Sequence, residues 1–61
     1  MKVTFQITKH LYDFSVVAMF FNEGEDRPAL VANVGLESYN IERLDSTVKQ
    51  LEKVGTVEFL S

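Results

Sequence analysis

Apolar and polar positions alternate along the first segment of the chain, residues 2–9, written KVTFQITK. Valine, phenylalanine and isoleucine would point to one side, and threonine and glutamine to the other, because successive side chains of a strand face opposite ways. Three of the eight residues are valine, isoleucine or phenylalanine and two are threonine, residue types that favour strands. The pattern predicts a strand with one face in water.

The next segment, residues 13–22, contains the run FSVVAMFF, in which seven of eight residues are apolar. As a strand it would carry Phe14, Val16, Ala18 and Phe20 on one face and Val17, Met19 and Phe21 on the other. Exposing an apolar side chain of this size forgoes about 1.5–3 kcal/mol. We therefore expect both faces to be covered, either by the C-terminal strand and loops folding back, by a second copy of the chain, or by a different protein.

A turn and a third strand follow. Asn22 to Pro28 holds glycine, proline and three acids, which predicts an acidic hairpin loop. Residues 28–34 alternate as a third strand, with Leu30, Ala32 and Val34 facing one way, and Gly35 is expected to end it.

Residues 38–44 are ambiguous, because Tyr39 and Ile41 alternate as in a strand whereas Ile41, Leu44, Val48 and Leu51 fit a helical stripe. We interpret them as a short fourth strand. Asp45, Ser46 and Thr47 are helix N-cap residue types and would be wasted inside a longer helix. The helix is then expected at residues 46–54, with Gly55 at its C-cap and a last strand at residues 56–60.

These elements predict an α+β fold, in which an antiparallel sheet of three or four strands packs with one main helix in the C-terminal half. With only 61 residues, the chain is expected to form a single domain, 1–61. The expected core is made up of Val3, Phe5, Ile7, Val16 or Val17, Leu30, Val48 and Leu51.

The amino-acid composition excludes several kinds of site and partner. The chain is 46% hydrophobic, which is too apolar for a disordered segment, and it has no cysteine, which excludes disulfides and thiolate zinc sites. Nine acids against six basic residues give a net charge of −3, the wrong sign for direct binding of nucleic acid. No apolar run is long enough for a membrane span or a signal peptide, and the expected location is the cytoplasm.

No motif indicates an enzyme. The one histidine, His10, lies at a predicted turn, and the spacing of Glu23, Glu25 and Asp26 matches no calcium loop. The serines stand in no nucleophile motif, and the glycines form no phosphate loop. We expect no catalytic residue, no metal and no cofactor.

What remains is a surface for a protein partner. Aromatic side chains are enriched at the centre of interfaces, and carboxylates accelerate encounter with a basic partner. The candidate contact residues are Phe20, Phe21, Glu23, Glu25, Asp26, Tyr12 and Tyr39.

Several short motifs resemble, in the same order, the small anti-CRISPR proteins that inhibit the type I-F surveillance complex. They are Met1-Lys2, His10-Leu11, Asn22-Glu-Gly24, the strand Ala29 to Val34 and the run Asp45 to Glu52. The resemblance covers about residues 1–54. This chain has Phe5 and Phe20 where the family uses tyrosines, and Ala32 where the family has an acidic contact residue; the family's C-terminal helical extension has no counterpart.

The resemblance implies a phage-encoded, non-enzymatic inhibitor in the cytoplasm of a bacterial host. Its sheet face and hairpin would dock on Cas7-like backbone subunits of the RNA-guided complex and block pairing of target DNA with the guide. The alternative is an antitoxin-like module, or an obligate homodimer, that uses the same open sheet face.

Overall fold

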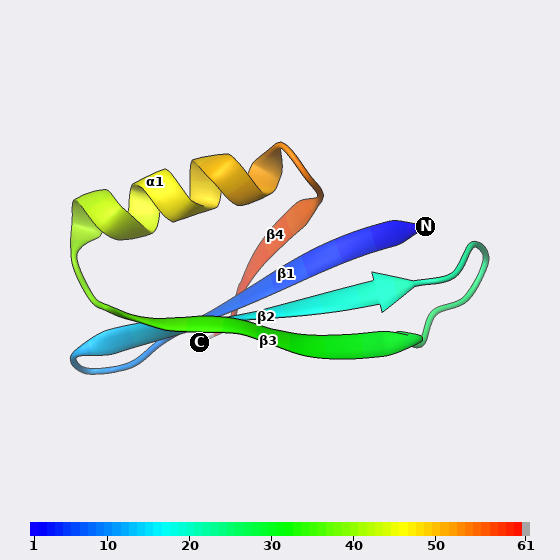
Figure 1. Cartoon of the computed structure of the whole chain (residues 1–61), viewed down its shortest axis with the longest axis horizontal. Coiled ribbons are helices and arrows are strands. Elements are labelled where there is room, and N and C mark those ends of the chain that lie inside the picture. Colours follow the sequence, from blue (N-terminus) through cyan, green and yellow to red (C-terminus); the bar gives the residue numbers. More distant parts are fainter. Residues whose placement is uncertain (61) are drawn as a thin grey trace.

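The computed structural model describes residues 1–60, which form one four-stranded sheet and one helix (Figure 1). Along the chain these are β1 (Lys2–Lys9), β2 (Asp13–Phe21), β3 (Leu30–Ser38), α1 (Ile41–Glu52) and β4 (Thr56–Leu60). The helix lies on one side of the sheet. The α+β class expected from the sequence is confirmed.

The strands lie in the order β3-β2-β1-β4. β1 and β3 both pair antiparallel with β2, whereas β4 pairs parallel with β1, so the sheet is mixed rather than wholly antiparallel. β3 and β4 therefore run in the same direction on opposite edges. A chain can join two parallel strands only by crossing over the sheet, and α1 makes that crossing.

The helix begins at Ile41, not at Ser46, and the predicted strand at residues 38–44 is wrong. Asn40 is the N-cap, and its side-chain oxygen accepts hydrogen bonds from the backbone N–H groups of Glu42 at 2.9 Å and Arg43 at 3.3 Å. Asp45, Ser46 and Thr47 lie inside the helix. Asparagine caps as well as serine or aspartate, so residue type alone could not choose between the two starts. The helix ends at the C-cap Lys53, two residues before Gly55.

Loss of the Asn40 cap should be measurable. We expect Asn40→Ala to lower the free energy of unfolding by about 1 kcal/mol, because two N–H groups lose their acceptor. Ser46→Ala is the matched control and should change stability by less than about 0.5 kcal/mol, since Ser46 is an exposed residue in mid-helix. Urea unfolding of both variants measures the difference, and an equal loss in both would contradict this start of the helix.

β3 continues through Gly35 to Ser38, although glycine was expected to end the strand. The pairing with β2 shifts by one residue at this point, because Val17 lies opposite Asn33 and Val16 opposite Gly35. Val34 is the extra residue of a β-bulge, a setting in which a glycine within a strand is common. The expected hairpin loop remains between β2 and β3, with Gly24 at a φ of 82°.

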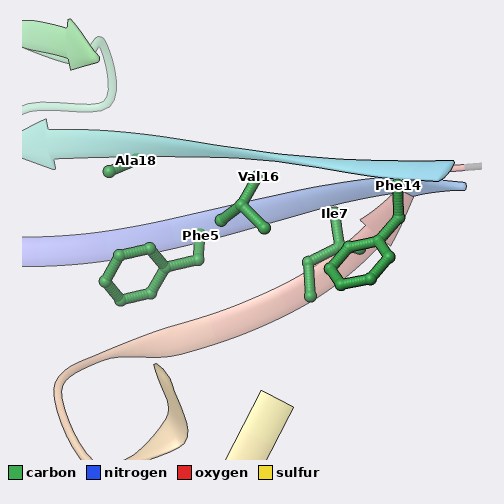
Figure 2. Close-up of a cluster of buried hydrophobic side chains, with 5 residues drawn as sticks. All are labelled: Phe5, Ile7, Phe14, Val16 and Ala18. Atoms are coloured by element: carbon green, nitrogen blue, oxygen red, sulfur yellow. The ribbon is translucent and has the colours of Figure 1, made fainter. Parts of the chain in front are cut away.

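The core lies between the sheet and α1. Its buried apolar residues are Phe5, Ile7, Phe14, Val16 and Ala18, all from β1 and β2 (Figure 2), and Ile7 and Phe14 are fully buried. Side chains from α1 and β4 that are partly buried pack against them: Leu44, Val48, Leu51 and Val57.

The predicted core is correct for Phe5, Ile7 and Val16, and Val3, Val48 and Leu51 are half-buried beside it. Leu30 is wrong, because 59% of this residue is exposed. It lies on β3, the edge strand farthest from β4, and α1 packs chiefly along the β4 side of the sheet.

Candidate functional site

The face of the sheet opposite α1 is open. No strand or helix within residues 1–60 lies over it, as Figure 1 shows. This face carries the second set of apolar residues in β2, namely Val17, Met19 and Phe21. All three are half-buried by their neighbours in the sheet rather than by a covering layer. Of the three covers that the sequence leaves open, the chain's own C-terminal strand is excluded, because β4 joins the edge of the sheet beside β1.

β3 extends the apolar part of the open face. Val31 lies opposite Met19, and Leu36 lies opposite Ser15, so both side chains point to the same side as Met19. Val31 is 56% exposed and Leu36 is 65% exposed. We call the five residues of this surface the open-face patch: Val17, Met19, Phe21, Val31 and Leu36.

The other half of the same face is polar. β1 contributes Thr4, which is buried, and the half-buried Gln6 and Thr8. The side chain of Gln6 donates a hydrogen bond to Glu58 of β4 at 2.7 Å. The open-face patch covers only β2 and β3, and the residues beside it over β1 and β4 are polar except for Leu60, which lies opposite Thr8 at the far end of β4. An apolar centre with a polar rim is the usual composition of a protein-binding surface.

Of the predicted contact residues, five lie at the end of the sheet formed by the loop between β2 and β3. Phe20 packs against the core on the helix side, whereas Phe21 belongs to the open face. Glu23, Glu25 and Asp26 are exposed in the loop itself. The adjacent positions Phe20 and Phe21 thus divide between core and surface, as their alternation requires.

A shallow hollow of about 510 Å³ lies at this end. The Lys2 ammonium lies 5.3 Å from the centre of the Phe21 ring, within the range of a cation–π interaction. The hollow is lined by Met1, Lys2 and residues 21–25. It opens beside the acidic loop, so it joins the open-face patch to the carboxylates of Glu23 and Glu25.

The two tyrosines lie at the opposite end of the sheet. The backbone N–H of Tyr39 donates a hydrogen bond to the carbonyl of Tyr12 at 2.9 Å, which brings the β1–β2 turn beside the start of α1. Tyr12 and its neighbour Leu11 are each 80% exposed, whereas the ring of Tyr39 is half-buried under the Lys9 ammonium at 4.4 Å. The predicted contact set is therefore two separate groups and not one site.

The single histidine lies beside a serine on the surface. His10 Nε2 lies 3.4 Å from the Ser15 hydroxyl on an exposed part of the surface. Within residues 1–60, no group of three histidine, aspartate or glutamate side chains is placed to hold a metal ion. The same residues include no helix that is long and apolar enough to cross a bilayer.

Sequence reasoning missed Val31 and Leu36 as surface residues. The alternation of residues 28–34 did place Val31 opposite Leu30, but it gave no reason to think that either side of the strand stays exposed. Leu36 was missed because the strand was expected to end at Gly35. The signal that could have found both is the apolar character of both faces of residues 30–36, which matches that of β2.

The fold and the open-face patch define a small α+β protein in which residues 1–60 cover one side of the sheet and leave the other open. Comparisons with protein-family models, with curated proteins and with solved structures find no match to this chain. The resemblance to type I-F anti-CRISPR proteins therefore stays a prediction from the short motifs that carry it.

Proposed function

We propose that this protein is a non-enzymatic inhibitor that binds a protein target through the open-face patch. The observation that carries the proposal is the position of five apolar residues on two adjacent strands, with no helix or strand of residues 1–60 above them. Asn33, opposite Val17, is the polar residue of β3 between Val31 and Leu36 on this face. Apolar residues gathered on an uncovered face and bordered by polar ones are typical of binding sites. Residues 1–60 include five buried apolar residues, so leaving five more on an uncovered face forgoes a large share of the burial that could stabilise the fold.

The target we propose is an RNA-guided defence complex of a bacterial host, with a phage as the source of the inhibitor. The order of motifs that resembles the type I-F anti-CRISPR proteins supports this choice. The net charge of −3 supports it independently, because a surface that guides nucleic acid is basic and attracts an acidic protein. By occupying Cas7-like backbone subunits, the protein would block pairing of target DNA with the guide, without itself binding nucleic acid.

The loop between β2 and β3 has a separate role in this proposal. Its three acids are exposed and lie at the end of the open-face patch, so they reach a basic target before the apolar residues do. Long-range attraction mainly raises the association rate, whereas apolar contacts mainly lower the dissociation rate.

The test is binding of target DNA by a crRNA-loaded type I-F complex in the presence of the protein. We expect the wild-type chain to inhibit DNA binding, and Met19→Lys to inhibit at least about tenfold less well, since it places a charge in the centre of the patch. Thr56→Lys is the matched control, because it adds the same charge on the polar part of the sheet. Retained inhibition by Met19→Lys would contradict the open-face patch, and no inhibition by wild type would contradict the target.

The steering role of the loop gives a second prediction. Replacing Glu23, Glu25 and Asp26 together by alanine should slow association with the same complex several-fold at low salt and weaken its salt dependence. The dissociation rate and the melting temperature should stay nearly unchanged, because the loop carries no core residue. Stopped-flow or surface-based kinetics at two ionic strengths measures this, and equal association rates in both buffers would exclude the loop as the steering element.

A further inference from the structure

We propose that the free edge of β3 pairs antiparallel with the β3 of a second copy of this chain, with the two-fold axis at Val34. The inference goes beyond the proposed inhibitor function, because it concerns the strand edge rather than the open face and requires no target. Three features of β3 support it: the unpaired backbone at its outer edge, the exposure of its side chains and the distribution of its charges.

β3 is an unprotected edge. Within residues 1–60 it pairs with β2 on one side only, so about every second residue of this nine-residue strand directs its backbone N–H and C=O groups outward, where no strand lies. Four large apolar residues of this strand are more than half exposed: Leu30, Val31, Val34 and Leu36. Edges of monomeric sheets are usually short, or they carry lysines, which makes a long apolar edge a template for pairing.

The other edge of the sheet is a poorer template. β4 has five residues, and its central Glu58 is hydrogen-bonded to Gln6. Short length and a charge are both features that protect an edge from pairing. β3 has neither lysine nor arginine, and its only charged residue is Glu37 near its end.

The position of Glu37 favours an antiparallel arrangement. In a parallel pair the two acidic loops would lie side by side. So would the two Glu37 side chains, each of which also lies 3.5 Å from the Arg43 guanidinium of its own chain. In an antiparallel pair about Val34, Glu37 lies opposite Val31 of the second copy. The two Glu37 residues are then six positions apart along the strand, about 20 Å, which exceeds the Debye length of about 8 Å at physiological salt.

The bulge also agrees with an axis at Val34. This residue is the midpoint of β3, and it divides the strand into two halves of four residues, 30–33 and 35–38. Under the two-fold rotation each half pairs with the other half of the second copy, and the two bulges meet on the axis. A pairing with its axis elsewhere would set a bulge against a regular strand segment.

A second copy is the occupant that these features fit, because an isologous contact needs a surface complementary to itself. β3 meets that condition, because its central residues are uncharged and exposed apolar side chains lie on both faces of the strand. Stable interfaces bury about 800 Å² per partner, and the accessible surface of this chain is 4598 Å². The edge of one strand is a small part of that surface, so the dimer contact is small. We therefore expect a dimer that depends on concentration rather than an obligate one.

Pairing at the edge leaves both open faces free. The two four-stranded sheets would join into a single sheet of eight strands. If this sheet is continuous across the pairing, both open-face patches lie on the same side of it. A target would then meet two copies of the patch, which raises avidity without any new contact.

Sedimentation of the purified chain from low to high micromolar concentration tests the dimer. We expect the wild type to pass from monomer to dimer, and Val34→Lys to stay monomeric over at least a tenfold higher range, because two lysines would meet on the axis. Thr56→Lys, on the opposite edge, should dimerise like wild type. A wild type that stays monomeric throughout, or a Val34→Lys variant that dimerises equally, would overturn the proposal.

A cysteine scan tests the register without requiring that Val34→Lys folds well. The chain has no cysteine, so a single introduced thiol can form a disulfide only between copies. We expect Val34→Cys to form the intermolecular disulfide under mild oxidation at least about tenfold faster than Leu30→Cys and Thr56→Cys. Equal rates at the three positions, or fastest cross-linking at Thr56→Cys, would overturn pairing through β3.

Discussion

Replacing Phe14 by alanine is expected to unfold most of the protein at room temperature. Phe14 is completely buried, between the sheet and the helix (Figure 2). Truncating a buried phenylalanine costs about 3–5 kcal/mol, and so small a domain has only about 5 kcal/mol in total. Loss of the strand and helix signals in circular dichroism, with a urea midpoint near zero, would report the effect.

Phe59→Ala is the control with the same chemical change. Phe59 is 60% exposed on β4, so its truncation should cost less than about 1 kcal/mol. Leu51→Ala should fall between the two, because Leu51 is half-buried against the core. If Phe14→Ala and Phe59→Ala melted at similar temperatures, the core would not lie where the structure places it.

Gly55→Ala is expected to have the second largest effect. A Cβ at this position would meet the carbonyl oxygen of Val3 and lie 3.1 Å from the Cβ of Val3. Val3 belongs to β1, so the turn between α1 and β4 would have to move away from the sheet. Such overpacking costs about 1–3 kcal/mol, and the urea midpoint should fall accordingly.

Gly35→Ala is the matched control, because nothing lies within 4 Å of its would-be Cβ. Alanine at this position reduces the conformational entropy of the unfolded chain, so Gly35→Ala should raise the free energy of unfolding by about 0.4–1 kcal/mol. Equal destabilisation by both substitutions would show that the close approach of Gly55 to β1 is not what limits the size of this residue.

How well the sequence predicted the fold differs from element to element. β1 was predicted with its bounds, since alternation over eight residues has only one interpretation. The start of α1 could not be predicted, because Asn40 and Ser46 are equally good caps. The stripe from Ile41 to Leu51 fits a helix, but Tyr39 and Ile41 also alternate as in a strand. The mixed sheet could not be predicted either, because strand direction depends on where the crossover ends.

The candidate site was predictable only in part. The alternation of β2 showed that Phe20 and Phe21 face opposite ways, and that one apolar face lacked an obvious cover. It could not show that Val31 and Leu36 extend this face, because that depends on the pairing of β3 with β2. Nor could it separate Tyr12 and Tyr39 from the acidic loop, since that depends on the length of the strands between them.

The central claim, that the open face is the contact surface, is tested most directly by the methyl signal of Met19. Carbon-13 labelling of methionine and alanine methyls also gives a signal for Ala18, which is buried on the helix side. When crRNA-loaded type I-F complex is added until the protein is bound, we predict a large shift of the Met19 methyl and little shift of the Ala18 methyl. A Met19 methyl that keeps its free chemical shift in the bound state would contradict the claim.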